Sequence, residues 1–581
     1  MLILGLNAFH GDASACIFKD GKLVVAAEEE RFSRIKHSAG FPLKSIEFCL
    51  KKLNINLDQV DYITINRNPK LRVVKKIIYA IKNVFKLKKI NDRYNNFKKI
   101  NSLEIQFEKY FDINPKIFKN KIVHVDHHLA HAASSVIPSK FSECNFVTVD
   151  GFGDFVSTTM GYFKNNHFKV LKEVLFPHSL GLFYTAMTQY LGFKNYGDEY
   201  KVMGLSPYGK PKYLNELKKV VYYDEKSLFL LNLKYFSHHT KGIEMSWLDG
   251  EPKFGDVFSE SLLDLLGKER EKNEELTQKH KDIASSTQKI YEEIFINIIN
   301  QLYKINPSEN LCVSGGCAMN SVANGKIKFN TKYNNIYINY APGDSGGSIG
   351  SSLFHLNNKV KFNYETLRRP YVGNTENEKI IEELLGFNKI LLDRSNIKVE
   401  KFSELNKLIE KIALKLSEGS VVGCFNGQME FGPRALGNRS ILADPRNKNM
   451  KDILNYKIKR REGFRPFAPS ILEEEVSNWF DVEDHVPYMS KVYNFKKNKT
   501  GLVPAVVHVD GSGRLQTVSR TENSFFYNLI KEFYKITAVP ILLNTSFNEN
   551  EPIVSNSKQA LDCFIRTKMD ILILENYVIS R

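Results

Sequence analysis

The feature that most constrains this chain is a β-hairpin plan that occurs twice, about 140 residues apart. Each copy is predicted to contain three strands, at residues 2–6, 13–18 and 22–27 in the first copy and at residues 146–149, 156–163 and 168–174 in the second. Asp20-Gly21 and Asn165-Asn166 are typical of the tight turns in such hairpins. The first turn of each copy has acidic or amide residues together with small residues, beside which backbone N–H groups can approach phosphate oxygens. The repetition indicates an internal duplication.

A duplicated hairpin clamp resembles the plan of the actin-like ATPase superfamily, which implies a nucleotide site. Glycine turns after apolar strands, at residues 314–316 and 342–348, fit a nucleotide cleft. Neither GxxxxGK[ST] nor GxGxxG after a strand is present, which excludes a Walker A motif and a Rossmann dinucleotide site. Two unrelated hairpins are the alternative. The candidate nucleotide-binding residues are Gly151, Ser314, Gly315, Gly316 and Asn320.

With 581 residues the chain is too long for one hydrophobic core, so we expect at least two domains. Helical periodicity is lost in a polar stretch near residues 357–369, and we place the boundary there, giving domains 1–362 and 363–581. The predicted elements are a helix at 284–305 in the first domain and, in the second, helices at 378–385 and 403–418 and strands at 420–425, 503–509, 539–543 and 570–574. Both domains are predicted to be α/β.

The net charge of +17 raises the question of a nucleic-acid partner. Between Lys70 and Ile100 there are eleven Lys or Arg and one acid, Asp92, and the apolar residues among them follow a helical spacing. We interpret this stretch as an amphipathic helix laid on a core with its lysines in water, rather than as a nucleic-acid or membrane-surface arm. We therefore expect no nucleic-acid partner and no membrane insertion.

The cysteine content and the N-terminal residues indicate the cellular location of the protein. Seven cysteines without a CxxC pair predict reduced thiols rather than a disulfide framework or a zinc site. No apolar run is long enough to span a membrane, and residues 1–9 lack the basic leader of a signal peptide. The expected location is the cytoplasm.

Four of the fourteen histidines fall within eight residues, at His124, His127, His128 and His131. His127 and His131 are four residues apart on a predicted helix, so they share a face and can bind one metal ion. Asp150 and Asp344 are candidate oxygen ligands, because each follows a predicted strand and lies in a glycine-containing turn. Such a donor set suits Fe²⁺, Mn²⁺ or Zn²⁺ better than Ca²⁺. A merely polar, histidine-rich helix start is the alternative.

The second predicted domain has a dense basic constellation between residues 429 and 469. Its cations stand among Gly, Pro and Phe rather than at a helical period, which predicts loops of fixed geometry. Guanidinium groups held in this way bind phosphate and offset the charge that develops in phosphoryl or adenylyl transfer. A nucleic-acid surface is the alternative, but no helix-turn-helix or RNP pattern accompanies the cations. The candidate phosphate-binding residues are Arg434, Lys459, Arg465, Arg514, Asn544 and Ser546.

Ordered motifs along nearly the whole chain match one known family. They are LGLNAFHGD from Leu4, AEEERFS from Ala27, HHLAHA from His127, GDEYKVMGL from Gly197, SGG from Ser314, GQMEFGPRALGNR from Gly427 and NTSFN from Asn544. By these motifs the chain resembles the O-carbamoyltransferase family that includes the nodulation protein NodU and the cephamycin and tobramycin carbamoyltransferases.

This resemblance implies an N-terminal domain similar to the actin-like ATPase of tRNA threonylcarbamoyladenosine synthesis and a C-terminal domain similar to the YrdC-type enzyme of that pathway. It implies that carbamoyl phosphate and ATP give carbamoyl adenylate and pyrophosphate in the C-terminal domain. The carbamoyl group then passes to a hydroxyl in the N-terminal domain, near an iron ion. The implied cofactors are ATP and a divalent metal, Fe²⁺ first, with Mn²⁺ or Mg²⁺ as alternatives, and a homodimer stays open.

Residue by residue, the resemblance assigns the metal to His127, His131, Asp150 and Asp344, and carbamoyl phosphate and adenylate to Arg434, Lys459, Arg465, Arg514 and Ser546. His10 and Asp12 fall at the catalytic loop near the acceptor. Gly11 between them departs from the family pattern.

Two rival functions remain at this point. A sugar kinase is common on the actin-like plan, but it needs no second arginine-rich domain and gives ADP without pyrophosphate. A tRNA-modifying RNA-binding protein would lose RNA affinity steeply with salt. The acceptor stays open among sugars, nodulation factors, antibiotics and surface polysaccharides, because specificity is expected in loops such as residues 237–273.

Overall fold

The computed structural model describes residues 1–82, 103–241, 245–246 and 250–581. The chain divides into two compact units, Met1–Arg368 and Arg369–Arg581. The first unit thus ends a few residues beyond the boundary expected after residue 362.

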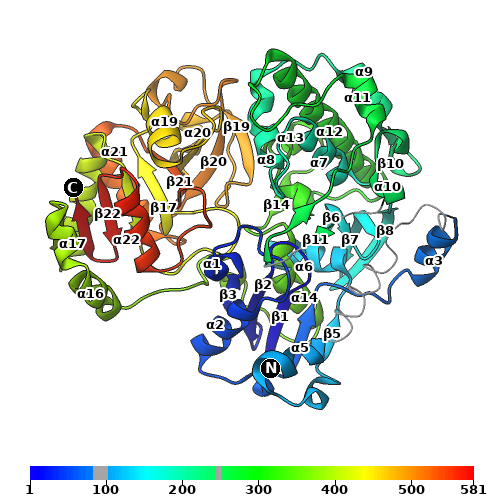
Figure 1. Ribbon diagram of the computed structural model, residues 1–581, viewed down its shortest axis with the longest axis horizontal. Helices are drawn as coiled ribbons and strands as arrows, with labels where there is room; N and C mark the ends of the chain where they lie inside the picture. Colours follow the sequence, from blue (N-terminus) through cyan, green and yellow to red (C-terminus); the bar gives the residue numbers. More distant parts are fainter. Residues whose placement is uncertain (83–102, 242–244, 247–249) are drawn as a thin grey trace. The chain divides into compact units, whose positions relative to one another are not determined.

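Unit 1 contains two five-stranded sheets built on one plan (Figure 1). Three antiparallel strands are followed by two strands parallel to the first of them, in the order β3-β2-β1-β4-β5 and β8-β7-β6-β13-β14. The strands are β1 (Leu2–Asn7), β2 (Ser14–Lys19), β3 (Lys22–Glu28), β4 (Tyr62–Ile65) and β5 (Ile122–His124), and β6 (Glu143–Gly153), β7 (Val156–Lys164), β8 (His167–Leu175), β13 (Asn310–Ser314) and β14 (Asn335–Ile338). The predicted duplication is confirmed.

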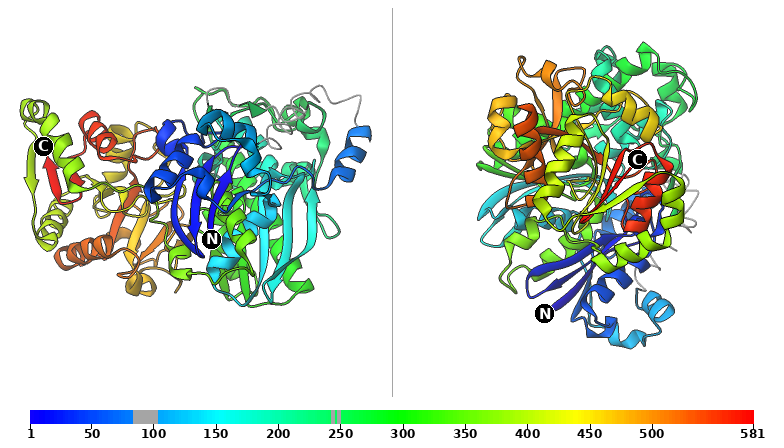
Figure 2. Two further views of the ribbon diagram at one scale, coloured as in Figure 1. Left: turned by 90° about the horizontal axis from the view of Figure 1, so that it is seen from below. Right: turned by 90° about the vertical axis from the view of Figure 1, so that its left-hand side faces the viewer.

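The tight turns of the two hairpins also match the prediction. Asp20 and Gly21 have φ of 50° and 77°, and Asn165 and Asn166 have φ of 51° and 59°. Two consecutive positive φ values define the turn that suits the twist of paired strands, and Asn, Asp and Gly tolerate them best. Figure 2 shows β1, β2 and β3 lying side by side.

Two helices with small residues pack closely between the sheets of unit 1. A Cβ on Gly350 of α14 (Gly347–Leu356) would lie 2.0 Å from the carbonyl oxygen of Ala130 in α6 (His127–Ser139). A Cβ on Gly5 of β1 would lie 2.2 Å from the carbonyl oxygen of Ser348. Glycine is therefore needed at both positions, and the approach brings the start of α6 close to residue 344.

The remaining elements of unit 1 cover the sheets or form their connections. The helices are α1 (Glu30–Ser33), α2 (Leu43–Leu53), α3 (Val73–Lys82), α5 (Leu103–Phe111), α7 (Leu180–Tyr190), α8 (Glu199–Leu205), α9 (Leu214–Val220), α10 (His238–Lys241), α11 (Glu260–Leu266), α12 (Gln278–Ile305), α13 (Ser321–Asn330) and α15 (Tyr364–Arg368). Short strands are β9 (Val221–Asp224), β10 (Leu228–Leu231), β11 (Met245–Ser246) and β12 (Lys253–Phe254). The helix expected at 284–305 is present and begins at Gln278.

Unit 2 is built on one nine-stranded mixed sheet, in the order β15-β23-β22-β16-β17-β21-β18-β20-β19. The strands are β15 (Lys398–Lys401), β16 (Val422–Phe425), β17 (Arg439–Ala443), β18 (Ala468–Leu472), β19 (Lys491–Asn494), β20 (Ser512–Val518), β21 (Ile541–Ser546), β22 (Ile571–Leu574) and β23 (Tyr577–Ser580). The helices are α16 (Glu378–Phe387), α17 (Lys389–Arg394), α18 (Leu405–Ser417), α19 (Met450–Asp452), α20 (Val476–Trp479), α21 (Ser524–Thr537) and α22 (Ser557–Arg566). The predicted α/β class is confirmed for both units.

The strand predicted at residues 503–509 is wrong. That segment is a loop with turns, and the strand is β20, which follows the turn at Asp510-Gly511. Pro504 has no N–H to give to a sheet, so the apolar residues around it are buried without strand pairing. Arg514 consequently lies in a strand of the sheet rather than in a loop.

The prediction for residues 70–100 is partly wrong and partly outside the described residues. Residues 73–82 form α3, as the spacing predicted, but the apolar residues of this helix are exposed instead of lying on a core. Residues 83–102 lie outside the described part of the chain. Among the residues that are described, no helix combines the length and the apolar character needed to cross a membrane.

Candidate active site

Four side chains predicted to hold a metal converge in unit 1. His127 and His131 come from the first turns of α6, Asp150 from β6, and Asp344 from the short turn before α14. All four are buried, and one ligand atom from each lies within 4.8 Å of the others. The structure therefore brings the predicted metal residues together.

The local structure explains why these side chains meet. The Asp126 side chain caps α6 by accepting a hydrogen bond from Leu129 N at 3.0 Å, so the helix begins at His127. Gly153 lies so close to His127 that a Cβ there would be 1.9 Å from the imidazole ring. Gly316 N donates to Asp150 Oδ1 at 3.1 Å, which turns Oδ2 toward the histidines.

The distances fit a bound cation. Asp150 Oδ2 lies 2.9 Å from His127 Nε2 and 3.4 Å from His131 Nε2, and Asp344 Oδ1 lies 3.5 Å and 3.4 Å from the same two nitrogens. Four ligands about 2.1 Å from one ion stand about 3.4 Å apart in a tetrahedron. Among the described residues, Asp344 Oδ1 is buried and accepts no hydrogen bond. The two Nε2 atoms face each other at 3.1 Å, an arrangement that needs a proton or a cation between them.

The charges also favour a cation at this point. Burial lowers the pKa of His131, but the nearby carboxylates of Asp150 and Asp344 outweigh it and raise that pKa to about 10. The carboxylates thus attract positive charge to the centre of the cluster. A two-histidine, two-carboxylate donor set suits a divalent transition metal.

The other two histidines of the run have different surroundings. His128 is buried with its ring nitrogens 2.6 Å from Thr148 Oγ1 and 3.0 Å from the carbonyl oxygen of Val156, and burial next to His127 lowers its pKa to about 3. His124 Nδ1 lies 3.0 Å from the carbonyl oxygen of Arg67. Both are therefore placed as parts of the scaffold.

His10 joins the metal cluster through Asp344. Its Nδ1 lies 2.5 Å from Asp344 Oδ2, the oxygen that faces away from the other two histidines. The carboxylate thereby fixes the orientation of the His10 ring, whose centroid lies 6.3 Å from that of His127. An imidazole held by one nitrogen presents the other nitrogen for proton transfer.

Asp12 has partners that the sequence did not indicate. Its Oδ1 lies 2.8 Å from His37 Nδ1, and Glu30 Oε2 accepts a hydrogen bond from His37 N at 2.8 Å. Burial lowers the pKa of His37, but the charge and hydrogen bond of Asp12 outweigh it and raise that pKa to about 9. These three groups form a second cluster of possible ligand atoms, at the edge of the loop that carries His10.

The segment around Tyr196 explains the unusual Gly11. A Cβ on Gly11 would lie 2.5 Å from Tyr196 Oη, so the hydroxyl takes the space that a side chain would need. A Cβ on Gly197 would lie 2.3 Å from His37 Nε2. Burial, followed by the charges of Asp12, Asp344 and Asp150, raises the pKa of Tyr196 well above its usual value. Tyr196 is therefore a protonated hydroxyl beside the metal cluster.

The predicted nucleotide residues lie near Asp150, and several have structural partners. Gly315 has φ of 91° and a Cβ there would meet the carbonyl oxygen of Val149 at 2.3 Å. The Asn320 side chain caps α13 and donates to Gln288 Oε1 at 2.9 Å. Gly151 faces open space, because no atom lies within 4 Å of a Cβ built on it. The turn at 314–316 thus supports the metal aspartate directly.

Unit 2 contains a cluster of guanidinium groups. Burial first, and then the like charges of Arg434, Arg461 and Arg465, lower the pKa of Arg514 well below its usual value. Arg461 was not singled out from the sequence; its Nε donates to Asn455 Oδ1 at 2.8 Å. Like charges gathered in this way favour a bound anion.

Two further predicted residues, Lys459 and Ser546, meet beside the loop that follows β21. Lys459 is buried, and its Nζ lies 3.4 Å from Ser546 Oγ, 2.8 Å from the carbonyl oxygen of Asn548 and 2.7 Å from Asn548 Oδ1. The ammonium group therefore fixes the shape of this loop. Asn544 Nδ2 donates to Gln516 Oε1 at 2.9 Å.

Arg439, within the basic constellation, is structural. It is fully buried, donates to the carbonyl oxygens of Asn426, Asn438, Asn374 and Gly427, and lies 3.6 Å over the Phe425 ring.

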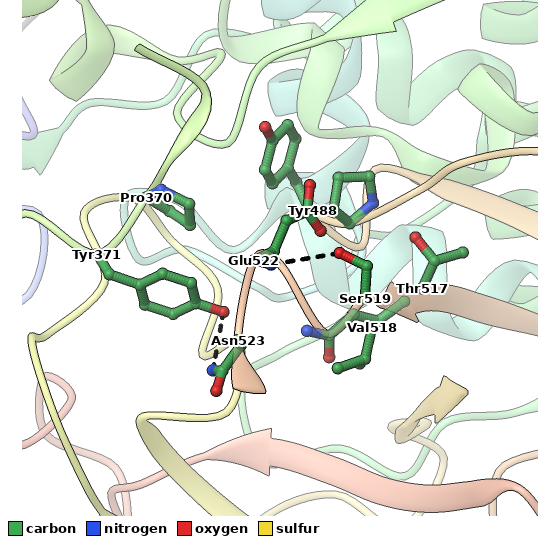
Figure 3. A pocket seen from close by; sticks show the side chains of 10 residues that line it. Pro370, Tyr371, Tyr488, Thr517, Val518, Ser519, Glu522 and Asn523 are labelled. Carbon is green, nitrogen blue, oxygen red and sulfur yellow. Dashed lines mark hydrogen bonds between the residues drawn. The ribbon is translucent and has the colours of Figure 1, made fainter. Parts of the chain in front are cut away.

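Figure 3 shows a pocket of the same unit, lined partly by Tyr371, Gln516 and Asn523. Gln516 is two residues from Arg514 on β20, so both side chains point to the same face of the sheet.

Comparisons with known proteins show the family to which the chain belongs. A family model described as carbamoyltransferase N-terminus matches residues 2–353, and one described as carbamoyltransferase C-terminus matches residues 413–581. The chain therefore belongs to the carbamoyltransferase family, and it is a carbamoyltransferase of the group that includes the nodulation proteins.

Two relatives carry the names of nodulation proteins. Nodulation protein NolNO of Sinorhizobium fredii is 33% identical, over 99% of this chain and 80% of that protein. Nodulation protein NolO of Bradyrhizobium diazoefficiens is 35% identical, over 79% of each chain. Among solved structures, T. kodakarensis HypF is 15% identical with a TM-score of 0.31, over 63% of this chain and 49% of HypF, a likeness too slight to bear on the fold.

Proposed function

We propose that this carbamoyltransferase uses ATP and carbamoyl phosphate to carbamoylate a hydroxyl of a saccharide or another small molecule, with the two half-reactions in different units. The observation that carries the proposal is the presence of two unlike centres: a cation cluster with a histidine beside it in unit 1 and an arginine cluster in unit 2. A kinase needs only one centre. The two-sheet plan of unit 1 is the plan expected of an actin-like ATPase domain, and we propose a YrdC-like role for unit 2.

In unit 2 the proposed reaction forms carbamoyl adenylate. Water displaces phosphate from carbamoyl phosphate, giving carbamate and inorganic phosphate. A carbamate oxygen then attacks the α-phosphorus of ATP, and pyrophosphate leaves. Arg434, Arg465 and Arg514 would hold the phosphates and offset the charge of the transition state, and Lys459 would keep Ser546 in place beside them.

In unit 1 the carbamoyl group passes from AMP to the acceptor. His10, oriented by Asp344, takes the proton of the acceptor hydroxyl as its oxygen attacks the carbamoyl carbon. The C–O bond to AMP then breaks. A divalent cation held by His127, His131, Asp150 and Asp344 would supply positive charge to the carbonyl oxygen. Tyr196 Oη would donate a hydrogen bond in the same region, and Asp12 would orient the acceptor.

The proposal is tested by measuring the half-reactions separately. Arg514→Ala should lower pyrophosphate release from ATP and carbamoyl phosphate by about a hundredfold or more, because a phosphate-binding charge is lost. His10→Gln should keep pyrophosphate release and lose acceptor carbamoylation, measured by mass spectrometry on a panel of hydroxylated acceptors. Arg520→Ala, an exposed cation near the end of β20, is the matched control and should behave as wild type.

Equal loss of pyrophosphate release in the His10 and Arg514 variants, both folded, would contradict the division of labour. ADP with a phosphorylated acceptor as products would indicate a kinase instead.

A further inference from the structure

His508 in unit 2 stands in a tight turn just before β20. Gly511 N donates to the carbonyl oxygen of His508 at 2.9 Å, and His508 N donates to the carbonyl oxygen of Ser512 at 2.7 Å. Gly511 has φ of 83°, a backbone conformation that suits glycine. The turn therefore fixes the imidazole beside Ser512, the first residue of the strand.

The His508 imidazole lies on the face of the sheet that carries the arginine cluster. Successive residues of a strand point to opposite faces, so Ser512, Arg514 and Gln516 share one face of β20. Leu515 belongs to the hydrophobic core on the other face. His508 Nδ1 lies 3.1 Å from Ser512 Oγ, which places the ring on the Arg514 side of the strand.

The hydrogen bonds around Ser512 determine which imidazole nitrogen carries the hydrogen. Burial, assisted by the charge of Arg514, outweighs Asp510 and lowers the pKa of His508 to about 4, so the ring is neutral at neutral pH. The Ser512 hydroxyl donates its only hydrogen to Asp510 Oδ1 at 2.6 Å. Ser512 Oγ can therefore only accept from His508, so Nδ1 carries the hydrogen and Nε2 has the lone pair.

The second nitrogen of His508 is available to a ligand. Nε2 is buried and accepts no hydrogen bond from the residues that the structure describes. A buried polar atom without a partner is unfavourable and calls for an explanation, and a role in binding or catalysis is one. Because its lone pair repels the oxygens of a phosphate, Nε2 needs a hydrogen-bond donor on a ligand that the nearby arginines hold.

We propose that His508 Nε2 accepts a hydrogen bond from the carbamoyl NH₂ group and thereby selects carbamoyl phosphate over acyl phosphates that lack an N–H group, such as acetyl phosphate. This assignment rests on the reaction proposed for unit 2. The NH₂ group is the only donor of carbamoyl phosphate at neutral pH, and also of the carbamate formed from it, since their other polar atoms are oxygens that accept. The arginines hold the phosphate, which every acyl phosphate has, so a contact to the NH₂ group is needed to distinguish among them. Acetyl phosphate would place a methyl group against Nε2 and leave that atom unpaired.

The test uses the full-length protein and measures pyrophosphate release from ATP and carbamoyl phosphate, with acetyl phosphate as the competing inhibitor. His508→Phe keeps a ring and removes Nε2, so it should raise the KM for carbamoyl phosphate about tenfold, the effect of one hydrogen bond. The inhibition constant of acetyl phosphate and the KM for ATP should stay within about twofold, because neither uses Nε2. His508→Gln should raise the KM for carbamoyl phosphate at most about threefold, since the amide oxygen can accept in place of Nε2.

The matched control is His485→Phe, a change at the other histidine of unit 2, whose ring is held by Glu473 and Glu522. It should behave as wild type, and circular dichroism shows whether each variant is folded.

Three results would overturn the assignment. Equal weakening of carbamoyl phosphate and acetyl phosphate in His508→Phe would mean that His508 only shapes the site. A higher KM for ATP alone would mean that Nε2 meets the nucleotide, and a lower kcat with both KM values unchanged would indicate a base for the attacking water. If wild type releases no pyrophosphate, the proposed reaction is wrong. Calorimetric titration of carbamoyl phosphate and acetyl phosphate into wild type and His508→Phe then tests His508 separately, with the same selective loss of affinity for carbamoyl phosphate expected.

Discussion

Three residues near the metal cluster have a positive φ, a backbone conformation that residues other than glycine rarely adopt. Phe9, Asp12 and His37 have φ of 60°, 55° and 53°. Each such residue costs of order 1 kcal/mol, and the strain is offset where the surroundings fix it. Here Asn7 Nδ2 donates to the carbonyl oxygen of Asp12 at 2.8 Å, and Phe9 N donates to the carbonyl oxygen of Gly40 at 2.7 Å. The strained loop holds His10 and Asp12 in one arrangement.

The pairing of His37 with Asp12 predicts a pH dependence of stability. The pKa of His37 rises from an ordinary 6.5 to about 9 on folding, so its charged form stabilises the protein fully below about pH 6.5 and that contribution is lost as pH rises through about 9. The difference in unfolding free energy between wild type and His37→Gln should therefore shrink across this range, as measured by urea denaturation. For His355→Gln no such change is expected, because burial lowers the pKa of His355 to about 4 and it stays neutral. Parallel curves for wild type and His37→Gln would contradict the pairing.

At the scale of elements, α6 presents two histidines one turn apart, and this predicts metal binding. Protein purified without oxygen should contain about one Fe, or a substitute such as Mn or Zn, per chain by elemental analysis. His127→Ala/His131→Ala should retain less than about a tenth of that, because two of four ligands are lost. His124→Gln changes a histidine of the same run that lies outside the cluster, and it should keep the metal. Full activity of metal-free wild type would refute the role proposed for the cluster.

The sequence predicts the structure of some elements correctly and that of others wrongly. Paired Asp-Gly and Asn-Asn turns identified the two hairpins, because their preference for positive φ is local. Residues 503–509 were misassigned, since apolar alternation does not distinguish a strand from a buried loop around Pro504. His37 and Tyr196 were missed, because their importance arises from contacts with segments distant in the sequence. The exposed face of α3 was missed for the same reason: its periodicity shows an apolar face but not which way that face points. Arg461 lies in the basic constellation at residues 429–469 but was not chosen among its candidate residues.

At the scale of the whole molecule, each unit has its own core, which predicts two thermal transitions. The core of unit 2 spans residues 381–579, and a core of unit 1 spans residues 4–118. Carbamoyl phosphate with a non-hydrolysable ATP analogue should raise one transition, since a ligand at a hundred times its Kd adds about 2.7 kcal/mol. For a unit of this size that is roughly 5–10 °C by scanning calorimetry.

A chelator should lower the other transition, because the metal ligands His127, His131, Asp150 and Asp344 all belong to unit 1. Arg514→Ala should abolish only the shift caused by carbamoyl phosphate, and His127→Ala/His131→Ala only the shift caused by the chelator. Inorganic sulfate serves as the control anion and should shift the first transition less than carbamoyl phosphate does. If either ligand moved both transitions together, or if the Arg514 variant lost both shifts, the two centres would belong to one cooperative unit. The separation of adenylation from transfer would then have no structural basis.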